Sequence, residues 1–181
     1  MNHTAVKKLT LSAMFLALGL LLPFLTGQIQ QFGNMLLPMH LPVLLCGLLC
    51  GWKYGLVVGT ATPLLRSLLF FMPPFFPAAV AMAFELATYG CMTGVFLLLS
   101  GRRLRHPLAK VYAALIPAML LGRIVWGGVM TVLMGLGKVS FSFQIFLTSA
   151  FVTALPGIVL QLVLIPALVL LLQRTGLWKA E

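Results

Sequence analysis

Acidic side chains are almost missing from this 181-residue sequence, which has two of them against twelve lysines and arginines. One, Glu181, is the last residue, so Glu85 is the single internal carboxylate. A single carboxylate cannot form the carboxylate pair of a glycosidase or a multi-carboxylate metal site. The sequence also has no G-x-S-x-G element and no phosphate-binding G-x-x-x-x-G-K motif. These absences argue against an enzyme and against ATP hydrolysis by this chain.

Cysteine is scarce as well, with three residues, Cys46, Cys50 and Cys91, all in apolar stretches. Cys46 and Cys50 share a helix face, but no histidine or carboxylate accompanies them. The sequence therefore predicts neither a disulfide framework nor a metal site, and nothing in it calls for a cofactor.

Charge of either sign is rare: 8% of the residues are charged and 61% are hydrophobic, with a mean hydropathy of +1.11. A soluble domain has roughly 25% charged residues, so an integral membrane protein is predicted. The apolar runs are continuous rather than alternating, which indicates helices. At about 20 residues per crossing, the chain fits one all-α domain, residues 1–181, built as a bundle of six transmembrane helices. Their predicted ranges are 9–26, 39–51, 55–71, 78–100, 108–134 and 143–173.

The basic residues give the bundle an orientation, because lysine and arginine accumulate in cytoplasmic loops. Placing both termini in the cytoplasm puts nine cations inside and only Lys138 outside, with Arg66 and Arg123 in the membrane. The nine are Lys7, Lys8, Lys53, Arg102, Arg103, Arg105, Lys110, Arg174 and Lys179. This bias accounts for the net charge of +10, because cytoplasmic loops beside a lipid bilayer are rich in lysine and arginine. The charge therefore does not indicate a nucleic-acid partner.

Three charged residues, Arg66, Glu85 and Arg123, lie inside the apolar runs. Charges at that depth are expensive and usually face a bundle interior or a wet cavity. Counted along their helices, all three lie between the middle and the outer side of the membrane. We expect them to meet in one polar pocket that opens to the outside.

Other polar and aromatic residues are expected near these charges. Tyr89 follows Glu85 by four residues and Trp126 follows Arg123 by three, so each pair shares a helix face. His40 lies near the outer end of the second predicted helix. Asn34 belongs to an uncharged segment, residues 27–38, which we interpret as an outer loop that folds over the site.

Glu85 can neutralise only one of the two arginines, and one interpretation of that pair is a lock that holds the bundle together. The other guanidinium then needs backbone carbonyls, water or an anionic ligand. Arginine suits a ligand carboxylate because its planar fork binds both oxygens. We therefore expect an anionic or polar small molecule as the ligand.

Ala13 and Ala17 are spaced four residues apart on the first predicted helix, next to Ser12. Small residues at that spacing allow another helix to approach closely. The approaching helix belongs either to this chain or to a partner, and both interpretations stay open.

Several segments resemble the membrane substrate-binding subunits, or S components, of energy-coupling factor (ECF) vitamin importers. The matching stretches are LPMHLPVLLCG at 37–47, GWKYG at 51–55, VG at 58–59, PLLRS at 63–67, PP at 73–74 and FELATYG at 84–90. The layout of the whole chain is similar, and Ala13 and Ala17 match the A-x-x-x-A signature of the family. Among its members, the pantothenate type is the most similar in pattern.

This resemblance implies a six-helix subunit in the plasma membrane of a prokaryote that captures a vitamin from outside. It would dock through Ala13 and Ala17 onto a membrane coupling subunit carrying two ATPases, and topple to release its cargo. The substrate would lie between the outer halves of the fourth to sixth helices, below the loop that follows the first. Pantothenate is an acid and would suit a spare arginine, and folate, cobalamin and queuosine precursors stay open as cargoes.

A proton-coupled exporter with Glu85 as the proton carrier is the main alternative, since a lone membrane carboxylate can work in that way. Two nearby guanidinium groups argue against it, because they would hold the carboxylate in its charged form and repel cationic drugs.

Overall fold

The computed structural model describes residues 3–26, 36–101, 104, 106–136 and 143–174, and every regular element in these ranges is helical. The first half contains α1 (His3–Leu21), the 3-10 helix η1 (Leu22–Thr26), α3 (His40–Cys50) and α4 (Trp52–Phe70). A π-helical turn, η2 (Phe75–Ala79), then leads into α5 (Val80–Gly101). The second half contains α6 (Pro107–Leu136), α7 (Phe143–Leu147), the π-helical turn η3 (Thr148–Val152) and α8 (Leu155–Arg174).

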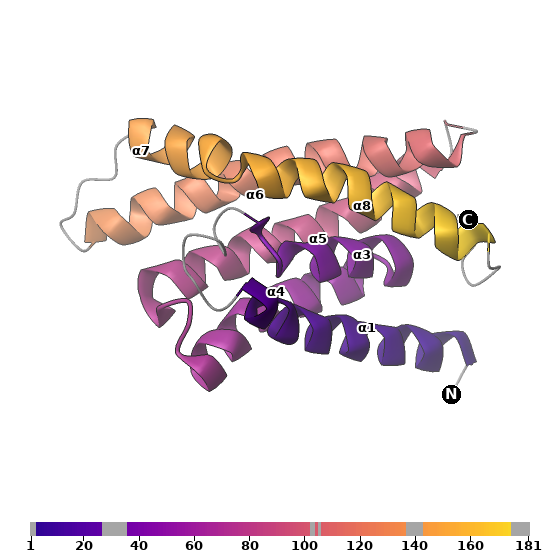
Figure 1. The fold of residues 1–181 in the computed structure, drawn as a ribbon, viewed down its shortest axis with the longest axis horizontal. Helices are drawn as coiled ribbons and strands as arrows, with labels where there is room; N and C mark the ends of the chain where they lie inside the picture. The colour runs from indigo at the N-terminus through magenta and orange to yellow at the C-terminus, as the bar shows by residue number, and fades with distance from the viewer. Residues whose placement is uncertain (1–2, 27–35, 102–103, 105, 137–142, 175–181) are drawn as a thin grey trace.

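The long helices form one elongated bundle (Figure 1). Helices α6 and α8 run side by side along one edge, α1 forms the opposite edge, and α3, α4 and α5 lie between them. The described chain begins and ends at the same end of the bundle. Within the described residues, four segments are long and apolar enough to cross a membrane: Thr4–Phe24, Phe75–Gly101, Pro107–Gly135 and Leu155–Arg174. With 11 residues, α3 is shorter than a crossing requires.

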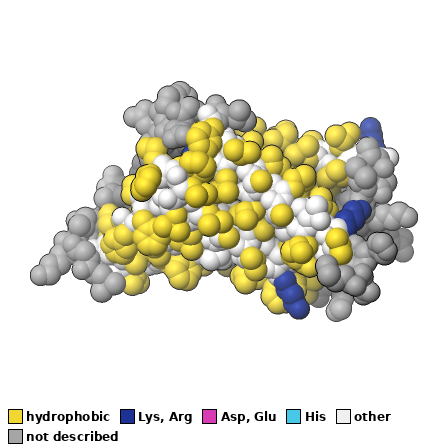
Figure 2. Space-filling view, turned by 90° about the horizontal axis from the view of Figure 1, so that it is seen from below, with side chains coloured by type: hydrophobic (Ala, Val, Ile, Leu, Met, Phe, Trp, Pro, Cys, Tyr) yellow, Lys and Arg dark blue, Asp and Glu magenta, His cyan; other side chains and the backbone are white. Residues whose placement is uncertain are grey.

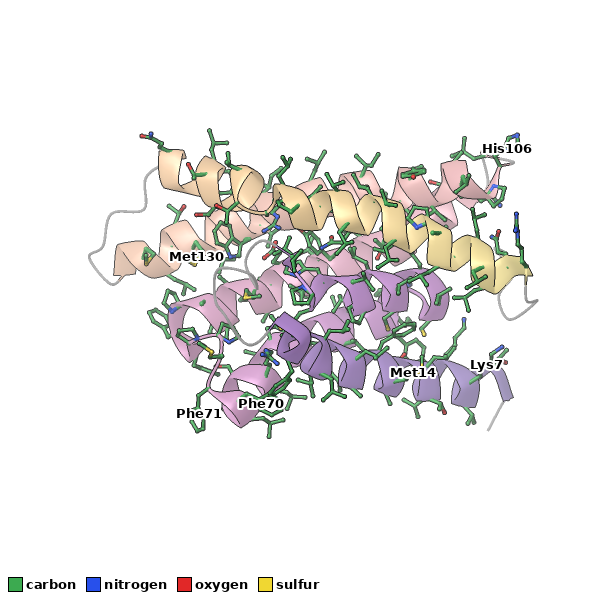
Figure 3. All side chains as sticks on the ribbon, in the orientation of Figure 1. Lys7, Met14, Phe70, Phe71, His106 and Met130 are labelled. Atoms are coloured by element: carbon green, nitrogen blue, oxygen red, sulfur yellow. The ribbon has the colours of Figure 1, made fainter. Side chains whose placement is uncertain are left out.

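The surface of the bundle is apolar and its interior contains polar groups. Figure 2 shows hydrophobic side chains over the middle of one face, with lysine and arginine at one end only. Lys7 and His106 lie at one end of the bundle, whereas Phe70 and Phe71 lie toward the other (Figure 3). Buried polar residues include Thr62, Thr93 and Gln161. This inverted pattern suits a protein whose solvent is lipid.

Glycines allow α4 and α5 to pack backbone to backbone. A Cβ atom on Gly90 would overlap the backbone of Gly55, and one on Gly59 would overlap that of Leu86. Helices in lipid gain little from hydrophobic burial, so close packing between small residues is what holds them together. This contact fixes α5, and with it Glu85, against α4.

Several helix ends differ from the sequence expectation: the first helix, expected over residues 9–26, starts at His3 and becomes the 3-10 helix η1 after Leu21. The third helix was expected to start at Gly55, but α4 starts at Trp52, because Gly51 alone makes the turn in a conformation with φ of +99°. The last helix is expected over residues 143–173 with bends near Pro156 and Pro166. The structure divides this range into α7, η3 and α8, and the break at residues 153–154 lies directly before Pro156, which occupies the first turn of α8, where proline costs no hydrogen bond.

Candidate functional site

Glu85 on α5 and Arg123 on α6 form a buried ion pair. Nη1 of Arg123 lies 2.9 Å from Oε1 of Glu85. Arg123 is 5% exposed and Glu85 is 1% exposed, so bulk water screens neither charge. Each ion would be costly to bury alone, and the pair is tolerated because the two charges cancel.

His40 and Tyr89 complete the cluster around this ion pair. Nε2 of His40, the first residue of α3, lies 3.5 Å from the same Glu85 oxygen. The rings of His40 and Tyr89 are 5.4 Å apart between centroids. Tyr89 is seated against α6 because Gly122 has no side chain, and a Cβ there would overlap the ring. Three helices therefore bring together four of the residues singled out in the sequence.

The cluster contains polar atoms without a hydrogen-bond partner among the described residues. They include Nδ1 of His40 and Nε and Nη2 of Arg123. Buried polar groups are normally hydrogen-bonded, so these atoms distinguish the cluster from an ordinary helix contact. Arginine nitrogens can only donate, and the tyrosine hydroxyl can donate as well as accept.

A cavity of about 200 Å³ lies directly beside the cluster, and it is partly open to the surface of the bundle, where Ile116, Leu120 and Leu155 are 47%, 49% and 59% exposed. Tyr89 and Arg123 line one part of it, and the rest of the lining is apolar and comes from α6 and α8: Ile116, Met119, Leu120, Leu155, Ile158 and Leu162. A concave, mostly apolar space is typical of a small-molecule site.

Arg66 lies apart from this cluster, contrary to the expectation of one pocket for all three charges. Its Nη1 donates a 2.7 Å hydrogen bond to the backbone oxygen of Leu20, in the last turn of α1. The guanidinium also lies over the rings of Phe24 and Phe70, 5.1 and 5.6 Å from their centroids. Carbonyls at a helix C-terminus attract cations, and aromatic faces do so too. Arg66 therefore joins α4 to α1 and η1.

The remaining sequence candidates are spread along the bundle. Trp126 stacks on Phe146 of α7, with 6.3 Å between ring centroids, and does not line the cavity. Asn34 lies outside the described residues. Ala13 and Ala17 are on the exposed face of α1, whereas Ser12 and Phe15 on the opposite face are buried. The helices in the described part of the chain therefore do not cover the two alanines.

Gln161 on α8 is a polar residue that the sequence reading missed. It is 1% exposed, and both atoms of its amide group lack a hydrogen-bond partner in the described part of the chain. On the helix it lies between Ile158 and Ile165, on the face that packs against the bundle. Its signal was present: it is the one amide inside an otherwise apolar span, and such residues face the interior.

These features define a class: a helical membrane protein with a ligand-sized cavity beside a buried charge pair. The family model for the substrate-specific component of ECF transporters matches residues 7–169. The chain belongs to this family, which confirms the resemblance seen in the sequence. It is accordingly a transport subunit and not an enzyme, and its partners in transport are a membrane component and separate ATPases. No curated protein and no solved structure matches the chain.

Proposed function

We propose that this chain captures a vitamin or related micronutrient outside the cell and delivers it to an ATP-driven ECF importer. The cargo site is the cavity between α5, α6 and α8. The observation that supports it most strongly is an apolar cavity of about 200 Å³, lined in part by Tyr89 and Arg123, directly beside the buried Glu85–Arg123 pair. A family member needs one such site for its substrate.

We further propose six membrane crossings with both termini in the cytoplasm of a prokaryotic cell. The described cations support this orientation: Lys7, Lys8, Lys53, Lys110 and Arg174 all lie within a few residues of the helix ends that it places inside. The described chain also begins and ends on the same side of the bundle, as an even number of crossings requires (Figure 1).

The docking surface proposed for the coupling subunit is the face of α1 that contains Ala13 and Ala17. Both alanines are exposed, and Met14 and Leu18 beside them are exposed apolar residues. Small residues on an uncovered face let a partner helix approach closely. Two ATPase subunits on the coupling subunit would supply the energy for release.

Uptake of radiolabelled vitamins tests this proposal when the chain is co-produced with a coupling subunit and two ATPases. Pantothenate is the first cargo to try. Accumulation should require ATPase activity. An exporter driven through Glu85 would instead respond to the proton gradient and work without the ATPases.

Replacing both alanines tests the docking surface. The variant with Ala13→Trp and Ala17→Trp should lose uptake, because two indoles block the approach of a helix, and should keep cargo binding in detergent. Val132→Trp, at an exposed position of α6, is the matched control and should transport normally. Loss of binding in the double variant would mean that the alanines support the fold rather than the partner.

A further inference from the structure

We propose that the turn between α4 and α5 is a membrane anchor whose phenylalanines insert into the outer leaflet of the bilayer instead of facing water. The turn, called the phenylalanine turn below, consists of residues Phe71 to Phe76. The anchor is independent of the cargo site. It requires only the proposed direction of α4, from the cytoplasm outward.

The phenylalanine turn presents three aromatic rings that the described helices leave uncovered. Phe71 is 84% exposed, Phe75 is 51% exposed and Phe76 is 56% exposed. Phe71 lies at a corner of the bundle, toward the end opposite Lys7 and His106 (Figure 3). Exposed apolar patches of this kind mark contacts with a membrane or with another protein.

The surroundings of the turn favour lipid over a protein partner. Residues 68–84 contain no charged, amide or hydroxyl side chain. Leu68 and Leu69, directly before the turn, are 62% and 58% exposed, and Phe84 in the second turn of α5 is 54% exposed. A protein interface ordinarily has a polar rim, and this surface has none in the described part of the chain. The turn therefore continues the lipid-facing sides of the two helices that it joins.

The length of α4 places the turn at the depth of the outer leaflet. With 19 residues, α4 rises about 28 Å along its axis. Its other end contains Trp52 and Lys53, with the lysine Nζ 5.5 Å from the ring centroid, and an aromatic residue with a cation is typical of the membrane–water interface. The hydrocarbon core is about 30 Å thick, so a helix of this length that starts at the inner interface ends at the outer edge of the core. Any tilt of α4 would place Phe71 deeper.

The backbone of the turn suits this position, because lipid cannot satisfy free N–H groups. Pro73 and Pro74 have no N–H. The N–H of Phe71 donates to the backbone oxygen of Ser67 at 3.0 Å, and the oxygen of Pro74 accepts from the N–H of Ala79 at 3.0 Å. Half of the six residues of the turn therefore bring no unsatisfied backbone donor into the bilayer.

Spin labels on the full-length chain test the anchor in vesicles of phosphatidylethanolamine and phosphatidylglycerol. Phe71→Cys and Phe76→Cys each carry one nitroxide in a Cys91→Ala background, because Cys46 and Cys50 are buried and stay unlabelled. Two relaxation agents are compared: molecular oxygen, which concentrates in hydrocarbon, and a water-soluble nickel chelate, which hydrocarbon excludes.

The labels at positions 71 and 76 should relax faster with oxygen than with nickel. A label at Val163→Cys, a 65% exposed position of α8, is the lipid control and should behave in the same way. A label at Lys53→Cys, at the other end of α4, is the interface control and should show the reverse order. Faster relaxation with nickel at positions 71 and 76 would place the turn in water and overturn the anchor. Access of neither agent would overturn it as well, because protein would then cover the turn, and spin–spin broadening would identify a second copy of the chain.

A pair of variants tests whether the phenylalanines hold the turn in lipid. Phe75→Ser with Phe76→Ser should abolish the oxygen preference of the label at position 71. Leu98→Ser with Leu99→Ser also removes two exposed apolar side chains, 59% and 56% exposed near the cytoplasmic end of α5, and should leave that label unchanged. A retained oxygen preference in the phenylalanine variant would refute the anchor. No readout involves cargo, so failure of the anchor and failure of the capture function are distinguishable.

Discussion

Breaking the Glu85–Arg123 pair should lower the free energy of unfolding strongly. The effects of replacing the two residues on this free energy should not add, because each residue is the partner of the other. Arg123→Met leaves the Glu85 carboxylate 1% exposed, with His40 at 3.5 Å as its remaining ion-pair partner. Removing one member of a buried pair costs about 3–5 kcal/mol. For a chain of this length about 1 kcal/mol shifts Tm by roughly 2–4 °C, so Tm should fall by about 6–20 °C.

The double variant Glu85→Gln with Arg123→Met should be far less damaged than the sum of its parts, because it leaves no unpaired charge. The expected coupling energy is about 2–3 kcal/mol, at the upper end of measured values for contacting residues. Thermal unfolding in detergent, followed by tryptophan fluorescence, gives the four Tm values of the cycle.

Arg66 provides the matched control for this cycle. Arg66→Met loses a charged hydrogen bond to Leu20, worth about 1.5–3 kcal/mol, and two aromatic contacts. This substitution leaves no carboxylate without a partner. Its effect on the free energy of unfolding should therefore add to that of Glu85→Gln within about 0.5 kcal/mol. Coupling of Glu85 to Arg66 instead of Arg123 would refute the assignment of the pair.

Two glycine substitutions test the packing around the site. Gly122→Ala should push the Tyr89 ring away from α6 and weaken cargo binding by about tenfold, equivalent to about 1.4 kcal/mol. Gly128→Ala is the control: its added Cβ meets nothing within 4 Å, so this variant should bind the cargo with wild-type affinity. Equal affinities in the two variants would remove Tyr89 from the site. Gly90→Ala should destabilise the protein by about 1–3 kcal/mol, because its new methyl group overlaps the α4 backbone, and Gly135→Ala in open space should not. Unchanged stability of Gly90→Ala in thermal unfolding would contradict the close packing of α4 on α5.

The class of the protein could be predicted from the sequence because the evidence for it is local. Continuous apolar runs indicate membrane helices wherever they occur, and the family motifs were read directly from the chain. Glu85 and Tyr89 could be placed on one helix face by spacing alone. The exposure of Ala13 could not be predicted from the sequence, because it depends on which sides of α1 the neighbouring helices cover.

The pairing of charges was beyond the sequence for the same reason. Depth along a helix follows from residue number, so Arg66 and Arg123 looked equivalent. Rotation about the helix axis decides which residue faces which neighbour, and it is set by tertiary contacts such as Gly90 against Gly55. The carbonyl of Leu20 that binds Arg66 has no signature in the side-chain sequence. The expectation of an anionic ligand rested on that arginine being unpaired.

The most direct test of the central claim is to fill the cavity between α5, α6 and α8 and measure cargo binding. Leu162→Trp places an indole in the cavity, whereas Val163→Trp places it on the lipid-facing side of α8, where Val163 is 65% exposed. At a hundredfold excess over Kd, the cargo identified for the wild type should stabilise it and Val163→Trp by about 2.7 kcal/mol. Leu162→Trp should remain folded without showing this stabilisation. Full stabilisation of Leu162→Trp by the cargo would contradict the account, because the cargo would then bind elsewhere.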